Sequence, residues 1–265
     1  MAKHVKNDPA RPVATDLPDP QWTLTRTDWA GLHHAYGPAT DAPKMLGALL
    51  DTDQAVRTKA LAYVHGILHH QNTIYEATVP TALYLAAILT DPRTTLPVDK
   101  THRDAPGCMR AELLDWIGSV ADEVTDEVDA ASRLHGFPLD GYPPAAAVRQ
   151  IRPQLSAAAF AHIGDADRHV SEAAIAACIP LLDDAELLPH RATLVPLLRE
   201  VLGTSERWQH RERAIDALDA WGEDSSGLEG QRNPFLFCDS DPPTDNSPQL
   251  ADPSLTEGYG ERPPF

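Results

Sequence analysis

The sequence predicts an all-α protein whose helices are arranged in repeated pairs. Apolar residues recur at helical spacing through most of the 265-residue chain, and we find no convincing strand pattern. A segment near residue 50 is also echoed far downstream at a constant offset, which is the signature of a helical repeat array. The matching positions are Asp51 and Asp165, Asp53 and Asp167, Val56 and Val170, and Ala60 and Ala174.

The N-terminal residues 1–21 are expected to form an extended arm, because their prolines prevent a continuous helix. We expect order to begin near Trp22. A short helix capped by Thr27 or Asp28 then runs through Tyr36, and a second helix covers residues 41–50. A third helix is expected to begin at Asp53 and to end at His70 or Gln71, with an apolar stripe made of Val56, Ala60, Val64 and Ile67.

The segment Thr73-Ile-Tyr-Glu76 has the spacing of a capping box, in which each end residue's side chain bonds the other's amide. A helix is therefore expected from Thr73 to Leu89, kinked at Pro80. Breaker-rich connections are expected at residues 91–104 and 135–144. The remaining helices are expected around 105–120 and near 145–163, 168–183, 187–202 and 206–221.

Residues 223–265 are rich in Asp, Glu and Pro and have almost no apolar periodicity, which predicts a solvated, acidic, Pro-rich tail. The length of residues 22–222 matches about four to five units of the HEAT or armadillo period. The predicted fold is therefore a HEAT-like α-solenoid of about four to five antiparallel helix pairs with disordered or extended termini. A weak third copy of the repeat places Arg211 and Ala214 where the first copy has Arg57 and Ala60.

The net charge of the chain limits the classes of partner that it is expected to bind. With 39 acidic and 22 basic side chains the formal net charge is −17. Such a field repels phosphate backbones and anionic lipid headgroups, so neither nucleic acid nor membrane is expected as a partner. A basic protein partner would be steered toward the molecule.

Cysteine usage points to a reducing compartment. Cys108, Cys178 and Cys238 are odd in number and widely spaced, so they indicate neither a disulfide framework nor a zinc site. The first residues lack the apolar run of a signal peptide, and no stretch reaches membrane-spanning length. We therefore expect a cytoplasmic protein.

Three blocks of the sequence resemble a known group of proteins. They are LHHAYGPATDAP at residues 32–43, DTDQAVR at 51–57 and HHQNTIYEAT at 69–78. They resemble bacterial, often actinobacterial, HEAT-repeat proteins in which H-A-Y-G and H-Q-G-T-x-Y-E-A-T recur; Asn72 stands where that group usually has Gly. The resemblance covers about residues 28–90. It implies the HEAT fold and, for function, a partner-binding or immunity protein associated with secreted toxins.

The histidines offer an alternative chemistry. His65 and His69 stand at i and i+4, a spacing that can chelate zinc, and His70 is adjacent. A metal-dependent enzyme built on this cluster is one hypothesis. The other is that the imidazoles hydrogen-bond the loop between two helices. Neither an H-E-x-x-H motif nor a Cys pair accompanies them, so we favour the second interpretation and expect no metal or other cofactor.

Two sets of carboxylates are further candidates for a site. The pairs Asp51/Asp53 and Asp165/Asp167 stand just before helices, where they are expected to cap free amides rather than to catalyse. The run over residues 122–129 is expected to form a broad acidic surface, either merely solvated or the landing place of a basic partner. Its carboxylates belong to Asp122, Glu123, Asp126, Glu127 and Asp129.

These observations favour a non-enzymatic, protein-binding scaffold, of the kind that serves as an immunity or antitoxin-type inhibitor of a basic partner. A HEAT-like DNA glycosylase is the third hypothesis, which the negative charge disfavours because such enzymes need a cationic groove. We expect no catalytic residue. The expected partner-binding residues are Arg57, His65, His69, His70, Tyr75, Asp122, Glu123, Asp126, Glu127 and Asp129.

Overall fold

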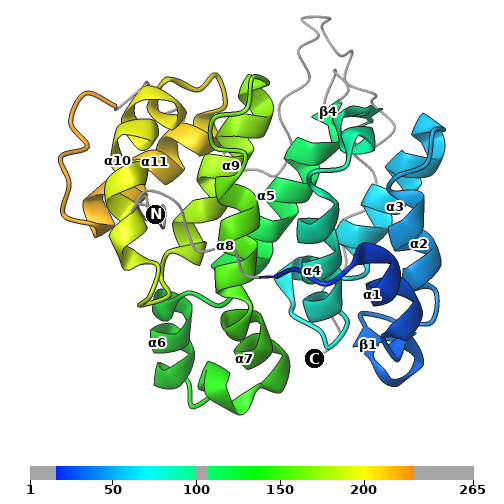
Figure 1. The fold of residues 1–265 in the computed structure, drawn as a ribbon. Coiled ribbons are helices and arrows are strands. Elements are labelled where there is room, and N and C mark those ends of the chain that lie inside the picture. Colours follow the sequence, from blue (N-terminus) through cyan, green and yellow to red (C-terminus); the bar gives the residue numbers. More distant parts are fainter. Residues whose placement is uncertain (1–15, 100–106, 229–265) are drawn as a thin grey trace, which may run out of the picture. The chain divides into compact units, whose positions relative to one another are not determined.

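The computed structural model describes residues 16–99 and 107–228, all of which belong to one unit spanning residues 1–232. These residues are mainly helical, so the all-α class is confirmed. The helices are α1 (Pro20–Arg26), α2 (Ala42–Ala48), α3 (Gln54–Gly66), α4 (Thr78–Ile88), α5 (Met109–Asp122), α6 (Asp126–Leu134), α7 (Pro143–Gln150), α8 (Arg152–Phe160), α9 (Arg168–Leu181), α10 (Arg191–Glu200) and α11 (Trp208–Ala220) (Figure 1).

Short 3-10 turns connect several of these helices. They are η1 (Trp29–Gly31), η2 (His70–Asn72), η3 (Pro92–Thr95), η4 (Leu139–Gly141), η5 (Leu188–His190) and η6 (Leu202–Thr204). No helix in the described part of the chain is long and apolar enough to cross a bilayer.

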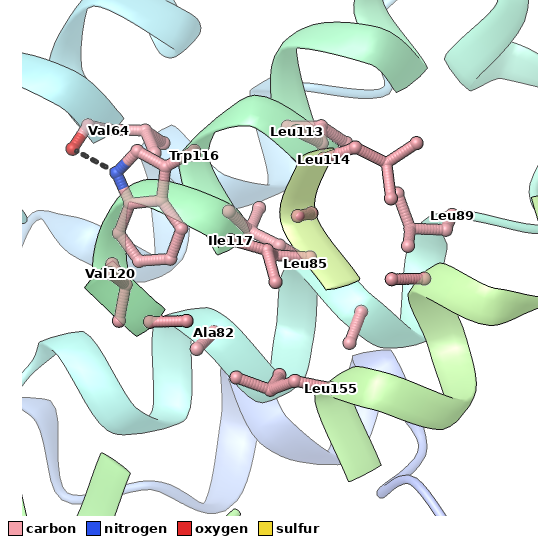
Figure 2. Close-up of a cluster of buried hydrophobic side chains, with 14 of the residues drawn as sticks. Val64, Ala82, Leu85, Leu89, Leu113, Leu114, Trp116, Ile117, Val120 and Leu155 are labelled. Carbon is pink, nitrogen blue, oxygen red and sulfur yellow. Dashed lines mark hydrogen bonds between the residues drawn. The ribbon is translucent and has the colours of Figure 1, made fainter. Parts of the chain in front are cut away.

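The core is organised around α5, which packs against α4 and most extensively against α9 (Figure 1). Most of the apolar side chains of α5 are buried, and Trp116 is fully buried. The indole N–H of Trp116 donates to the Val64 carbonyl of α3 at 3.2 Å, as Figure 2 shows. Leu85 of α4 and Leu155 of α8 join the same cluster, so α5 ties four other helices into one core.

The aspartate pairs form matching turns at the starts of α3 and α9. The amide of Asp53 donates to the Asp51 carboxylate at 2.8 Å, and the amide of Asp167 donates to Asp165 at 3.0 Å. Asp53 and Asp167 in turn cap their helices by accepting from the second amide beyond them. The predicted capping role of both pairs is confirmed, and it lowers the cost of leaving the first helical amides unpaired.

The expected helix through Tyr36 is wrong. Residues there form η1 followed by an antiparallel hairpin of β1 (His33–His34) and β2 (Gly37–Pro38). Gly37 has φ of +128°, a conformation that a helix excludes and that glycine adopts without strain. A second pair, β3 (Pro97–Val98) and β4 (Gly107–Cys108), also corrects the expectation that the chain has no strand.

The third helix buries Ala60 and Val64 as predicted, but the rest of its buried face differs from the prediction. It ends at Gly66, and Val56 is exposed, while Arg57, Leu61 and Leu68 are buried beside Ala60 and Val64. The predicted stripe treats Arg57 as polar and therefore as exposed. Its guanidinium instead lies inside and bonds to backbone carbonyls, which rotates the buried face by about one residue.

The predicted capping box at Thr73 does not form. Helix α4 begins at Thr78, and the Tyr75 amide donates to the Thr78 hydroxyl at 2.8 Å. That hydroxyl donates to the Leu68 carbonyl, so Thr78 joins the loop to the end of α3. Pro80 consequently lies in the first turn, where its missing N–H costs nothing, and the predicted kink is absent.

Other predicted boundaries shift by a few residues. Helix α1 begins at Pro20, with Asp19 capping it, so order starts slightly before Trp22. The helix expected over 105–120 is α5, and the one expected over 145–163 is divided into α7 and α8 at Ile151. Pro153 in the first turn of α8 explains that break. The rest of the predicted N-terminal arm, and the predicted tail beyond residue 228, lie outside the described residues.

Candidate functional site: an acidic groove beside α11

A groove of about 530 Å³ lies where the C-terminal ends of α5 and α9 meet α6 and α11. Acidic side chains outnumber basic ones on its lining, where Arg213 is the basic residue. The lining residues are Asp122, Thr125, Glu127, Val128, Ile179, Pro180, Asp183, Gln209, Glu212, Arg213, Asp216, Ala217, Ala220 and Trp221.

Three of the lining carboxylates have no charged partner or hydrogen bond among the described residues. They belong to Glu127 of α6 and to Glu212 and Asp216 of α11. Glu212 and Asp216 stand at i and i+4 on one face of α11, where like charges cost a helix about 0.2–0.5 kcal/mol. Folding therefore keeps an unfavourable pair of negative charges facing the groove.

The two remaining carboxylates are held by arginines. Asp122, the last residue of α5, pairs with Arg213 of α11, and burial raises the pKa of Asp122 above its usual range despite that partner. Asp183 pairs with Arg191 at 3.2 Å and accepts from the amide of Asp126. These bonds join α5 to α11 and the turn after α9 to α6 and α10, so they position the free carboxylates as well as neutralising part of the charge.

The predicted acidic run is divided by the structure, because α5 ends at Asp122 and α6 begins at Asp126. Asp122 and Glu127 line the groove. Asp129 does not: it is buried, lies 2.9 Å from Arg133, and accepts from the Leu139 amide at 2.9 Å. It therefore closes the α6–η4 turn and does not line the groove.

Asp126 and Glu123, the other members of the run, differ in their surroundings. Asp126 is exposed and pairs with Arg149 of α7. Glu123 is half-buried beside Asp122, and burial, followed by repulsion from that neighbour, raises its pKa. The one broad acidic face that the sequence predicts is thus replaced by a groove whose second acidic wall comes from α11.

Arg57 is removed from the predicted binding surface by burial, since only 2% of it is exposed. Its guanidinium donates to the carbonyls of Asp51 and Thr52, both at 2.9 Å, and to that of Pro97 at 2.5 Å. A side chain that satisfies three carbonyls inside the fold cannot contact a partner. Arg57 instead joins the turn before α3 to the β3 segment.

The predicted histidine cluster does not form one site. His69 is buried outside α3, with its Nδ1 3.3 Å from the Thr73 carbonyl and its Nε2 3.1 Å from the Ser119 hydroxyl. Burial lowers the pKa of His69 to about 4, so the ring is neutral, donating to Thr73 and accepting from Ser119. Both ring nitrogens are therefore occupied and leave no lone pair for a metal.

His70 and His65 point to other surroundings. The Nδ1 of His70 lies 3.0 Å from the Gly66 carbonyl, and its ring packs on the exposed Tyr36 at 5.5 Å between centroids. His65 lies on the exposed side of α3, and Tyr75 is half-buried in the loop before α4. No group of three or more His, Cys, Asp or Glu side chains in the described ranges is arranged to hold a metal ion.

The contribution of α11 to the groove does not emerge from the sequence. Glu212 and Asp216 are separated from the acidic run by more than 80 residues, and no local pattern connects them. The one signal is the i, i+4 pair of like charges on a helix whose opposite face is apolar. Trp221 follows the last residue of α11, and its ring lies beneath the Arg191 guanidinium at 5.1 Å from the ring centroid.

Comparisons with known protein families, with curated proteins and with solved structures give no match to this chain.

Proposed function

We propose that the protein is a non-enzymatic binding protein whose acidic groove receives a basic segment of a protein partner. The observation that carries the proposal is the set of three carboxylates on the groove walls, from Glu127, Glu212 and Asp216, that are unpaired within the described chain. Lysine or arginine side chains entering the groove would neutralise these charges in a partly desolvated site, where charge-assisted hydrogen bonds are strongest.

The composition of the groove lining suits a protein segment. Its lining mixes carboxylates with the apolar surfaces of Val128, Ile179 and Trp221. A peptide that carries both cations and aliphatic carbons matches this mixture, because long basic side chains bury their methylene stems while their charged ends reach polar groups. The net charge of −17 would also accelerate encounter with such a partner.

The proposed fold family is that of HEAT-like repeat proteins. The turn at Asp51 and Asp53 recurs at Asp165 and Asp167, and a third copy has Ser205 accepting from the amide two residues on. The third copy repeats a further contact. Arg211 donates to the carbonyl six residues before it, as Arg57 does. An immunity or antitoxin-type role for a cytoplasmic protein is the function we propose within that family.

The test is site-specific photo-crosslinking in the producing cells. A photoreactive amino acid replaces Gln209 on the groove lining, and a matched sample carries it at the exposed Glu186. We expect a basic protein to be captured from Gln209 only. Its purified complex with the full chain should then be weakened about tenfold by Glu212→Gln with Asp216→Asn, about 1.4 kcal/mol.

The control pair Glu186→Gln with Glu206→Gln removes the same charge from exposed positions outside the groove lining. It should leave the affinity within about twofold. An acidic partner, or equal weakening by both double variants, would contradict binding in the groove.

A further inference from the structure

Helix α11 forms one wall of the groove but contributes no buried residue to the main core of the described chain. Three of its four buried apolar residues, Ala214, Ala217 and Leu218, belong to a second, small cluster that they share with α9, α10 and η6; the fourth is Ile215. By contrast α5, on the opposite side of the groove, places large side chains such as Trp116 and Leu113 in the main core. Two of the four buried apolar residues of α11 are alanines, which bury little area, whereas α5 buries six larger apolar side chains, so apolar burial stabilises α11 less than it stabilises α5.

Polar contacts supply the rest of the attachment. At the start of α11, Arg207 pairs with Asp115 of α5 at 3.5 Å. In the middle of α11, Arg213 pairs with Asp122, which is also a residue of α5. Arg213 also donates to the Ala176 carbonyl of α9 at 3.4 Å. These bonds run directly from α11 to the two central helices.

A buried cluster on α9 completes the attachment. The Glu172 carboxylate accepts from the Ser205 hydroxyl at 2.8 Å and from His210 Nδ1 at 3.1 Å. Arg168, one turn earlier, donates to Glu172 at 2.8 Å and to the Thr204 carbonyl at 2.9 Å. Glu172, Ser205 and His210 are each at most 5% exposed. Hydrogen bonds between such buried groups are strong, and breaking only some of them would leave buried polar groups without partners at a high free-energy cost.

We infer that α11, one wall of the acidic groove, can detach from the rest of the fold while the core stays folded. It is held closed by the bonds of Glu172 with Ser205 and His210 and by the ion pairs of Arg207 and Arg213. Regions with few buried apolar contacts open at lower free energy than the core to which they attach. When α11 leaves, Glu212, Asp216 and Arg213 leave with it, so the groove exists only in the closed state. A basic segment that bridges α6 and α11 would favour closure.

The inference rests on the proposed function only for the identity of the ligand that favours closure. Opening itself is a property of the chain without any partner. The two are therefore tested by separate parts of one experiment.

That experiment is native-state hydrogen exchange of the full chain, resolved by residue. We expect the α11 amides to exchange together, at least tenfold faster than the α5 amides. Glu172→Gln, which keeps the shape but removes the charge shared by Arg168 and His210, should increase α11 exchange a further tenfold or more and leave α5 unchanged.

Asp129→Asn is the matched control. It removes another buried, arginine-paired carboxylate, in the α6–η4 turn, and should leave the ratio of α11 to α5 exchange unchanged. If Glu172→Gln unfolds the whole chain, Arg207→Gln replaces it, because that side chain is only partly buried and acts at one ion pair. Exchange of α11 in step with α5, in the native chain and in the variant, would overturn the inference.

An octa-arginine peptide is added in the second part. Slower α11 exchange with peptide supports closure by a basic ligand. If α11 opens separately but its exchange does not respond to the peptide, the inference that α11 opens would stand, and only the proposed function would be contradicted.

Discussion

Gly118 of α5 lies directly against Ala177 of α9, so that a Cβ on Gly118 would come within 3.0 Å of the Ala177 Cα and 3.3 Å of its Cβ. Both residues are in the interior of their helices, where the backbone atoms are fixed and cannot move aside as a flexible side chain can. The absence of a side chain at Gly118 therefore sets how closely the two central helices approach.

Gly118→Val should destabilise the protein by about 1–3 kcal/mol, because overpacking forces the two helices apart. Urea unfolding followed by circular dichroism measures the change. Gly164→Ala is the matched control, since a Cβ at Gly164 would meet no atom within 4 Å and should change stability by less than about 0.5 kcal/mol. Equal effects of the two substitutions would contradict close packing at Gly118.

Arg57→Met should destabilise the fold by about 1–3 kcal/mol, because it leaves three backbone carbonyls without the guanidinium that now donates to them. Partner affinity of the folded fraction should not change, since Arg57 is buried. A variant with native stability and reduced affinity would restore Arg57 to the binding surface that the sequence predicts.

Asp53→Ala and Asp167→Ala should each cost about 1 kcal/mol, since each carboxylate caps the first turn of its helix. The two losses should be similar because the turns match. Thermal unfolding of both variants and of Asp28→Ala, which affects only the short turn η1, provides the comparison. A loss from one aspartate alone would show that the turns are not equivalent.

Stability should fall between pH 6.5 and pH 4 through His69 and His210. Burial lowers the folded pKa of each to about 4, below the value of about 6.5 in the unfolded chain. Below pH 6.5 these histidines bind protons in the unfolded state but stay neutral in the folded state. The stability that their neutral burial allows is therefore fully present above pH 6.5 and declines as the pH falls. By pH 5 the expected loss is about 2 kcal/mol for each histidine.

Urea titrations at pH 7.5 and pH 5 measure that loss. His210→Gln should reduce the difference between the two conditions by about 2 kcal/mol, the contribution of one such histidine, and His135→Gln, an exposed replacement, should leave it unchanged. A stability that is the same at both pH values would contradict neutral burial of the two rings.

The sequence predicts structure correctly where one residue and its immediate neighbours decide it. The aspartates before α3 and α9 cap them as predicted, because an Asx side chain reaches its own following amides wherever it stands. The errors occur where distant contacts decide. Thr78, rather than Thr73, begins α4 because its hydroxyl bonds the end of α3, and Arg57 is buried because Pro97, 40 residues away, offers a carbonyl.

The same distinction applies to the candidate site. The run from Asp122 to Asp129 is visibly acidic in the sequence, but its division between α5 and α6 and the loss of Asp129 to Arg133 depend on packing. The opposite wall, with Glu212 and Asp216, comes from a part of the chain that only the folded arrangement brings near. A groove assembled from separate helices leaves no contiguous motif to recognise.

The most direct test of the acidic groove is calorimetric titration of the full chain with an octa-arginine peptide at low and moderate salt. We predict a complex that weakens as salt rises and that Glu212→Gln with Asp216→Asn weakens about tenfold at low salt, about 1.4 kcal/mol. The Glu186→Gln, Glu206→Gln control should bind like the native chain. Binding that both double variants weaken equally, or that the groove variant leaves unchanged, would contradict the account.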